Sequence, residues 1–377
     1  MNSDRLKIGF VRRGYSASGG AEAYLKRLAQ GVCDAGHEAH LISTADWPPN
    51  EWSFGQVTQL PGNTPTQFAD AVEEARPGLG LDVMMSLERI WQCDVFRAGD
   101  GLHRAWLQRR AHYNSALKKI KAVFNRKHRA ILGLEESLLC HGGARRVITN
   151  SRLIKEEINW LYGLPADEID LIYNGVPLSE FANVAQDRAK NRAAFGLAED
   201  EIVVLFAGSG WTRKGLRFAI EAVEACGISK MRFLVAGKGN TSPFRERQVE
   251  FLGEVQDLAA LYSAADIFLL PTIYDPFSNA CLEALAAGLP VITTETNGFS
   301  EIIEDGKHGS VIPDAADLVS FRDALHFWAD PNRRAQARPL IQERAAQYSI
   351  ARNVEATLRI LFQAASAAST VGKISKI

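Results

Sequence analysis

Residues 275–290 read Asp-Pro-Phe-Ser-Asn-Ala-Cys-Leu-Glu-Ala-Leu-Ala-Ala-Gly-Leu-Pro. The pattern predicts a loop that carries Asp275, a helix with Glu283 in its early turns, and then a strand over residues 291–294. The N-terminus of a helix attracts phosphate through its unpaired N–H groups and its dipole. A carboxylate accepts hydrogen bonds from two adjacent hydroxyls of a sugar. The stretch therefore predicts a ligand that carries both phosphate and sugar.

The simpler interpretation of this stretch is an amphipathic helix that leaves Glu283 in solvent. Two acids eight positions apart are common and say little by themselves. The Pro-Phe that follows Asp275 and the Glu-Ala-x-Ala-x-Gly-x-Pro-Val pattern of residues 283–291 argue against chance.

Short apolar runs alternate with helical patterns along the chain. In the first half, the predicted strands are residues 8–11, 39–42, 83–86 and 146–149. In the second half, the predicted strands are residues 202–206, 233–236, 248–252, 267–270 and 291–293. Near-continuous apolar strands that are separated by helices indicate a parallel sheet covered on both faces.

Two such sets on one chain predict an α/β protein with two doubly wound, Rossmann-like domains. A length of 377 residues is enough for two domains. Ligands of such sheets bind beyond the carboxyl ends of the strands, so the site is expected in a cleft where the two domains face each other.

Composition narrows the class of protein. The chain is 46% hydrophobic and 23% charged with a net charge of −1, which predicts a globular protein without general attraction to nucleic acid. The five cysteines are scattered and include no Cys-x-x-Cys pair, which favours a reducing, cytoplasmic setting. No apolar run approaches the ~20 residues that span a bilayer. The eight histidines are dispersed, so no catalytic metal is predicted.

The acid-x7-acid stretch resembles the E-x7-E motif of retaining glycosyltransferases of the GT-B fold, especially family 4, with Asp275 in place of the usual first Glu. Asp-Leu-Ile-Tyr-Asn-Gly-Val at residues 170–176 resembles the interdomain linker of that family. Tyr348-Ser349 precedes a helix that resembles the one crossing back onto the first domain. The resemblance covers nearly the whole chain. It implies an acceptor-side domain over residues 1–168 that is completed by 349–377, a linker over 169–182, and a nucleotide-sugar domain over 183–348.

A short glycine loop, Ser18-Gly19-Gly20, lies between the first predicted strand and the first predicted helix. Glycines there let the backbone approach a phosphate, although a tight turn is the plainer explanation. In the resembling family this loop faces the donor diphosphate, which implies that role for Gly19 and Gly20. The resemblance also implies further donor contacts: Glu283 to the ribose, and Asp275 with the backbone of Pro276, Phe277 and Ser278 to the donor sugar.

Arg213 and Lys214 lie in the loop after the first strand of the second domain. Two cations in a short loop suit a diphosphate leaving group, whose charge grows as the glycosidic bond breaks. A solvated basic turn is the alternative. The adjacent Arg-Lys-Gly resembles the lipopolysaccharide core glucosyltransferases.

The acceptor side is predicted at residues 97–104, Arg-Ala-Gly-Asp-Gly-Leu-His-Arg. Asp100 resembles an acid that the core glucosyltransferases offer at this point, whereas many other members of the family use a histidine. We therefore expect Asp100 to act on the acceptor side, with His103 as the second candidate. An aspartate that caps the following helix is an equal alternative.

Residues 104–129 contain nine Lys or Arg and no acid, with apolar residues at helical spacing. This basic stretch predicts an amphipathic surface that binds an anionic membrane or an anionic acceptor. A helix packed on its own domain with a solvated basic face is the alternative. The corresponding region of the core glucosyltransferases associates with membranes.

The resemblance implies a retaining, metal-independent hexosyltransferase. Its donor is expected to be a nucleoside-diphosphate hexose, with UDP-glucose as the first choice, and its acceptor a glycan or lipid-linked glycan such as the lipopolysaccharide core. No cofactor is expected beyond this co-substrate, and the expected location is the cytoplasm, peripheral to the inner face of the cytoplasmic membrane. The alternatives are a sugar-nucleotide-binding scaffold with little turnover, and an epimerase or phosphorylase on the same fold.

Overall fold

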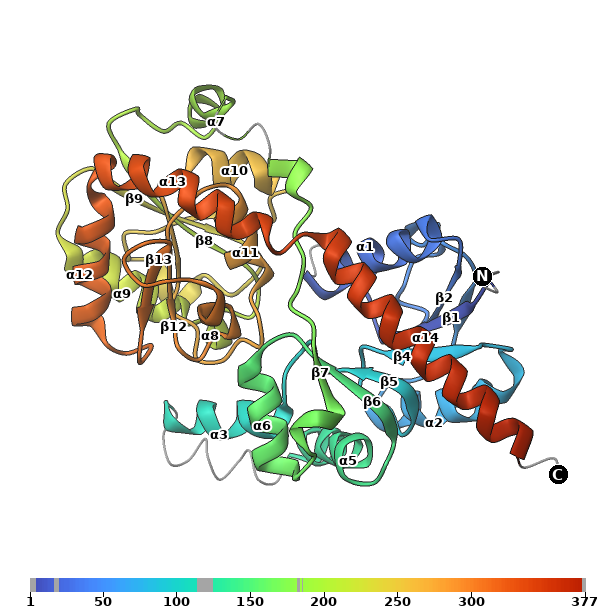
Figure 1. The fold of residues 1–377 in the computed structure, drawn as a ribbon. Helices are drawn as coiled ribbons and strands as arrows, with labels where there is room; N and C mark the ends of the chain where they lie inside the picture. Colours follow the sequence, from blue (N-terminus) through green and yellow to red (C-terminus); the bar gives the residue numbers. More distant parts are fainter. Residues whose placement is uncertain (1–4, 17–19, 114–124, 182–183, 185, 375–377) are drawn as a thin grey trace. The chain divides into compact units, whose positions relative to one another are not determined.

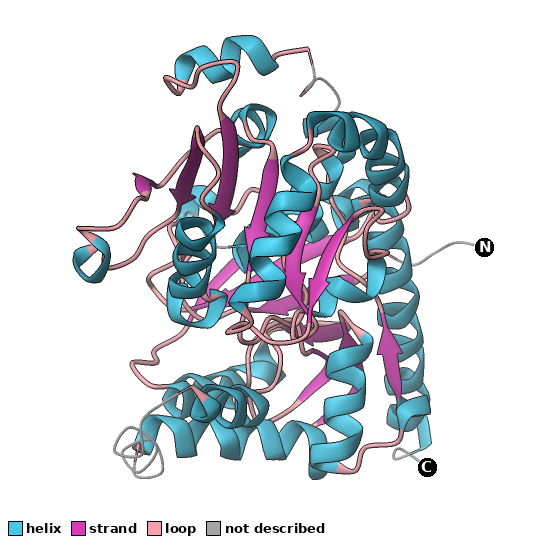
Figure 2. Ribbon diagram, turned by 90° about the vertical axis from the view of Figure 1, so that its left-hand side faces the viewer, coloured by secondary structure: helices cyan, strands magenta, loops and turns pink. Residues whose placement is uncertain are grey.

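The chain forms two compact α/β units, Met1–Tyr173 with Ala351–Ile377, and Asn174–Ile350. The structure, a computed structural model, describes residues 5–16, 20–113, 125–181, 184 and 186–374, with side chains described as far as residue 367. In each unit, helices cover both faces of a parallel sheet (Figures 1 and 2).

The described part of the first unit contains one sheet of seven parallel strands in the order β3-β2-β1-β4-β5-β6-β7. The strands are β1 Lys7–Val11, β2 Glu38–Ser43, β3 Val57–Gln59, β4 Val83–Ser86, β5 Cys93–Arg97, β6 Ala144–Thr149 and β7 Ile169–Leu171. The central strands β4 and β5 are buried along their whole length, as a sheet covered on both faces requires. The chain order reverses between β1 and β4, so the loops that follow these strands diverge and leave room for a ligand.

The described helices of the first unit are α1 Gly20–Asp34, α2 Pro65–Ala75, α3 His103–His112, α5 Arg126–Cys140, α6 Arg152–Tyr162 and α14 Ile350–Ile374. Helix α1 buries an apolar stripe that includes Leu25 and Leu28, whereas α3 buries only Ala105. Helix α14, red in Figure 1, packs against α1. Tyr24 of α1 donates a hydrogen bond to Asn353 at 2.9 Å, and Val354 lies against Gly31. The C-terminal helix therefore completes the first unit.

The described part of the second unit contains six parallel strands in the order β10-β9-β8-β11-β12-β13. The strands are β8 Ile202–Ala207, β9 Met231–Ala236, β10 Glu250–Gly253, β11 Ile267–Leu270, β12 Val291–Thr294 and β13 Gly309–Ile312. The helices are α7 Arg188–Ala194, α8 Trp211–Lys214, α9 Leu216–Cys226, α10 Leu258–Ala264, α11 Asn279–Ala286, α12 Leu318–Ala329 and α13 Pro331–Ala346. The order reverses between β8 and β11. Of the helices described in both units, none is long and apolar enough to cross a membrane.

The predicted fold class is confirmed, since both units are parallel α/β sheets of the Rossmann type. The sequence analysis did not identify strands β3, β5, β7 and β13. Strand β5 was obscured by Asp94 and Arg97, which are both buried. The segment predicted as a linker, residues 169–182, begins as strand β7, because its first residues pair with β6; the division between the units falls after Tyr173.

At the junction of α8 and α9, the backbone of the chain packs closely against the backbone that follows β11. Gly215 has a φ of +74°, and a Cβ atom there would lie 1.8 Å from the carbonyl oxygen of Pro271. Gly227, at the other end of α9, has a φ of +65° with no atom within 4 Å of such a Cβ. The two glycines share the left-handed conformation, which would strain any other residue, and they differ in the space around them.

We expect Gly227→Ala to lower the free energy of unfolding by about 1–2 kcal/mol, the cost of a left-handed alanine. Gly215→Ala should cost at least about 3 kcal/mol, because strand-end backbone must also move. Urea unfolding of both variants measures the difference. Equal losses would show that the junction yields easily to the added methyl group.

Candidate functional site

The second unit brings three predicted site residues together where its strand order reverses. Arg213 and Lys214 end the short helix α8, which follows β8, and Asp275 lies in the loop after β11. Two hydrogen bonds join these loops, because Ile273 N and Thr272 Oγ1 each donate to the carbonyl oxygen of Arg213 at 2.8 Å. The topology therefore assembles residues that are about 60 positions apart.

The Asp275 carboxylate is paired with both cations. Lys214 Nζ lies 3.1 Å from Asp275 Oδ2, and Arg213 Nη1 lies 3.8 Å from the same oxygen. The side chains of Asp275, Lys214 and Arg213 are 6%, 12% and 35% exposed. Burial by itself raises the pKa of Asp275, but Lys214 and Arg213 outweigh burial and hold that pKa below its usual value. The cluster carries one net positive charge and presents Arg213 most openly.

Asn297 supports the loop that carries the predicted sugar contacts. Its Oδ1 accepts a hydrogen bond from Ser278 N at 3.3 Å, and its Nδ2 donates to Thr293 Oγ1 at 2.9 Å. The backbone of Asp275 pairs with this second loop as well, since Asp275 N donates to Thr296 O at 3.0 Å. Asn297 is not among the predicted site residues. The sequence did place Asn297 just after β12, at the same sheet edge as the other loops, and this position could have indicated a role in the site.

Pro276, Phe277 and Ser278 are buried, so this loop has backbone rather than side chains to offer a ligand. Pro276 has no N–H, the N–H of Phe277 bonds to the Asp275 carboxylate, and the N–H of Ser278 bonds to Asn297. A donor sugar at this loop would share these groups or use the first turn of α11, which Ser278 caps. The predicted contacts of these three residues stay predictions.

Glu283 lies in the second turn of α11 and is half-buried. The hydroxyl of Tyr262, a fully buried residue of α10, donates to Glu283 Oε2 at 3.2 Å and reaches Ala280 O at the same distance. The protein therefore orients the Glu283 side chain. The simpler interpretation expected this side chain to point freely into solvent, and it does not. Tyr262 is a second residue that the sequence analysis did not assign to the site.

The first unit places Asp100 after β5, at the carboxyl edge of its sheet. Asp100 Oδ2 accepts a hydrogen bond from Arg12 Nη1 at 2.7 Å, and the Asp100 side chain is 46% exposed. Gly20 is the exposed first residue of α1. Gly19 lies outside the described residues.

His103 begins α3 and faces helix α5. Its Nε2 lies 3.0 Å from Nδ1 of His128, and its backbone N–H donates to Glu135 Oε2 at 2.6 Å. Burial, with the nearby Arg89 as the next cause, lowers the pKa of His103 to about 4. The neutral imidazole is thus committed to a helix contact, which leaves Asp100 as the more exposed of the two acceptor-side candidates.

Glu135 anchors this region and was not predicted. Its side chain is fully buried and accepts hydrogen bonds from Arg89 Nε at 2.7 Å, from the first two backbone N–H groups of α3, and from the Tyr162 hydroxyl. Although burial raises the pKa of Glu135, these donors, with Arg89 first, bring it below its usual value. As the first acid after the acid-free basic stretch, Glu135 was visible in the sequence as a break in that pattern.

The basic stretch is only partly described, because residues 114–124 lie outside the described residues. On α3, Arg104 pairs with Glu136 and Arg109 pairs with Glu157, so acids from α5 and α6 offset part of its charge. On α5, Arg126, Lys127 and Arg129 are exposed.

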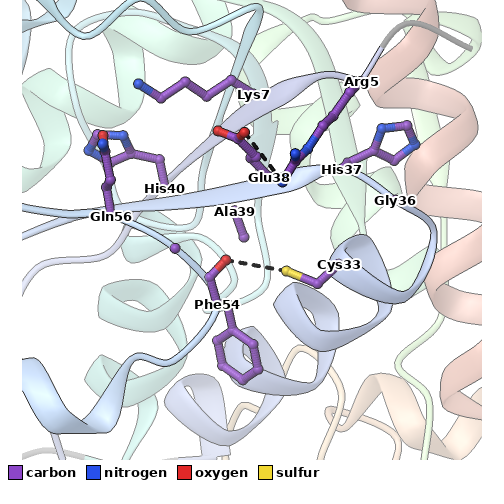
Figure 3. A pocket seen from close by; sticks show the side chains of 11 residues that line it. Arg5, Lys7, Cys33, Gly36, His37, Glu38, Ala39, His40, Phe54 and Gln56 are labelled. Atoms are coloured by element: carbon purple, nitrogen blue, oxygen red, sulfur yellow. Dashed lines mark hydrogen bonds and ion pairs between the residues drawn. The ribbon is translucent and has the colours of Figure 1, made fainter.

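A cavity of about 550 Å³ lies elsewhere on the first unit (Figure 3). It is formed at the amino ends of β1 to β3, by residues that include Lys7, Glu38 and Gln56, and contains none of the predicted residues. Figure 3 shows Arg5 paired with Glu38 across its rim. Ligands of open α/β sheets bind at the opposite, carboxyl ends of the strands. Despite its volume, this cavity is therefore not assigned to the site. Across the residues that the structure describes, no group of three or more His, Cys, Asp or Glu is arranged to hold a metal ion.

Comparison with known proteins identifies the family in both units. Residues 18–180 match the model described as Glycosyltransferase Family 4, and residues 201–326 match the model described as Glycosyl transferases group 1. An uncharacterised glycosyltransferase of Methanocaldococcus jannaschii is 28% identical over 343 residues, which cover 84% of this chain and 87% of the relative.

Solved structures share the fold. WaaG, a glycosyltransferase involved in lipopolysaccharide biosynthesis, superposes with a TM-score of 0.81 at 20% identity, over 94% of this chain and 99% of WaaG. HepE of Anabaena, in complex with UDP-glucose, superposes with a TM-score of 0.67 at 19% identity, over 97% of this chain and all of HepE. With two parallel sheets, and glycosyltransferase matches in both units, this chain is a glycosyltransferase of the family 4, GT-B type.

Proposed function

We propose that this enzyme moves a hexose, glucose from UDP-glucose in the first instance, to a glycan or lipid-linked glycan such as the lipopolysaccharide core, with retention of the anomeric configuration and without a metal. The cluster of Arg213, Lys214 and Asp275 at the reversal of the second sheet carries this proposal. The UDP-glucose complex of HepE and the lipopolysaccharide role of WaaG support the choice of donor and acceptor.

Arg213 and Lys214 act on the leaving diphosphate. Negative charge grows on its oxygens as the glycosidic bond breaks, and cations already fixed in place stabilise that charge without reorganising. Arg213 supplies a fork of N–H donors, and Lys214 supplies a point charge whose position is set by Asp275. In this front-face reaction the leaving phosphate accepts the proton of the acceptor hydroxyl.

Further contacts to the donor are proposed within each unit. Glu283, oriented by Tyr262, binds the ribose hydroxyls, and Asp275 with the backbone of residues 276–278 binds the hexose. The same proposal assigns Gly19 and Gly20 of the first unit to the donor diphosphate; Gly19 lies outside the described residues. Asp100 accepts a hydrogen bond from a second hydroxyl of the acceptor, beside the reacting one, and so positions the acceptor, while His103 supports the Asp100 loop.

Three alternatives make different predictions in an assay. A scaffold protein would bind nucleotide sugar and never release nucleotide. An epimerase would change the sugar without an acceptor, and a phosphorylase would require inorganic phosphate and pyridoxal phosphate. The Asp275 that replaces the usual Glu keeps the scaffold as the main competitor.

The basic stretch provides a membrane contact in this proposal. Arg126, Lys127 and Arg129 are exposed on α5, and anionic lipid headgroups attract such residues. The enzyme would then lie on the inner face of the cytoplasmic membrane, where a lipid-linked acceptor is at hand.

The proposed reaction is tested with UDP-glucose and lipopolysaccharide whose core lacks hexoses, in the presence of excess EDTA. UDP release and transfer of labelled glucose are expected, and NMR of the product should show an α-glycosidic bond. Binding without UDP release would support the scaffold instead. Loss of transfer in EDTA that Mn²⁺ or Mg²⁺ restores would contradict the metal-free reaction.

Glu283→Gln should weaken UDP binding about tenfold to a hundredfold, because a hydrogen bond to a charged group contributes roughly 1.5–3 kcal/mol. Isothermal titration with UDP measures the change. Glu304→Gln, on an exposed glutamate that pairs only with Lys307 among the described ion pairs, is the matched control and should bind UDP like the wild type. Unchanged affinity in Glu283→Gln would remove the ribose assignment.

Replacing Arg126, Lys127 and Arg129 with Gln should reduce binding to anionic vesicles about a hundredfold, at ~1 kcal/mol for each charge. Co-sedimentation at low and high salt measures it, and binding should fall as salt rises. Replacing Lys230, Lys307 and Arg333, three exposed cations of the second unit, removes the same charge and should have little effect. Wild-type protein that binds neutral and anionic vesicles alike would contradict an electrostatic contact.

A further inference from the structure

Arg12 occupies the reversal point of the first sheet, immediately after β1, and contacts two acids from different elements. Its Nη1 donates to Asp100 Oδ2 at 2.7 Å. Its Nε donates to Glu22 Oε1 at 3.2 Å, and its Nη2 lies 3.1 Å from the same oxygen. The Arg12 side chain is 14% exposed and that of Glu22 is 9% exposed, whereas that of Asp100 is 46% exposed. The guanidinium is thus largely buried, and of its two hydrogen-bonded acids Asp100 is the more accessible.

The charges around Arg12 argue against an anion-binding role for it. Burial by itself lowers the pKa of Arg12, but the carboxylates of Asp100, Glu88 and Glu22 outweigh burial and raise it. A phosphate that approached Arg12 would meet these acids first. The guanidinium is therefore used inside the protein, where Glu22 fixes one edge of its fork and Asp100 receives the other.

The backbone around Asp100 is held by a separate set of contacts. Arg89 donates to the carbonyl oxygen of Gly101 and pairs with the buried Glu135, which in turn accepts from the N–H of His103. These bonds hold the backbone of the loop without any contribution from Arg12. What Arg12 determines is therefore the orientation of the Asp100 carboxylate.

We propose that Arg12 is a positioning residue that keeps the Asp100 carboxylate aimed at the acceptor, with Glu22 orienting Arg12. This inference rests on the proposed acceptor-side role of Asp100. One Asp100 oxygen is bound to Arg12, so the carboxylate cannot rotate freely, and the Asp100 side chain is 46% exposed. Because the carboxylate is already ordered before the acceptor binds, binding does not have to include the entropic cost of ordering it.

The test compares Arg12→Gln, Arg12→Lys and Asp100→Asn in transfer from UDP-glucose to lipopolysaccharide whose core lacks hexoses. Arg12→Gln should lower kcat/KM for the acceptor about tenfold to a hundredfold, the effect of losing a charge-assisted hydrogen bond. Arg12→Lys should recover part of the loss, because lysine keeps the charge but not the fork. The double variant Arg12→Gln with Asp100→Asn should be no worse than Asp100→Asn alone, since both act through one carboxylate.

Arg146→Gln is the matched control. Arg146 makes a two-pronged pair with Asp170 in the same unit, at 2.6 and 2.8 Å, away from the strand-reversal loops. Arg146→Gln should lower Tm about as much as Arg12→Gln does, and it should leave transfer unchanged. An equal loss of transfer in Arg146→Gln, or additive losses in the double variant, would overturn the positioning role of Arg12. Unchanged transfer in Arg12→Gln would also overturn the positioning role. If the wild-type protein shows no transfer to this acceptor, the proposed function itself is refuted.

Discussion

Both sheets of this enzyme are parallel and covered by helices on both faces, and this constraint dictates where polar chemistry can be placed. The interior strands carry mostly apolar side chains, with exceptions such as Asp94 and Arg97 of β5, so most ionised groups lie in the loops at the ends of the strands. At the two reversals of strand order, between β1 and β4 and between β8 and β11, neighbouring loops turn apart. Arg12 follows β1, and the loops after β8 and β11 bring Lys214 to Asp275.

Buried carboxylates organise the loops at these edges. Taking a charge out of water is costly, and the cost is offset only where partners are close and well oriented. Asp275 has two cations and Glu135 has an arginine, two backbone N–H groups and a tyrosine hydroxyl. Each acid therefore ties together segments that the chain places far apart, and the loops gain a defined shape without regular secondary structure.

The two units carry different polar groups at the carboxyl edges of their sheets. The second unit has the cations Arg213 and Lys214 and a helix with an oriented glutamate, whereas the first unit has an exposed aspartate on a braced loop. The cavity in Figure 3 lies at the amino ends of the strands, where no loops diverge, and this is why its volume is a poor guide to function. Similarity below 25% identity to WaaG and HepE reflects this shared architecture and leaves the acceptor to be decided by the loops of this chain.

The sequence by itself determined the fold class, most of the central strands and the residues at the second reversal, because apolar periodicity and the acid-x7-acid stretch are local patterns. Strands β3, β7 and β13 escaped notice because they are short or lie at a sheet edge, and β5 because its charges are buried. Only the tertiary structure decided that Lys214 contacts Asp275, that Arg12 contacts Asp100, and that His103 turns to His128. Those pairings join residues 25 to 88 positions apart, and no local pattern encodes them, because the crossovers of a parallel sheet bring together loops that are distant in the chain.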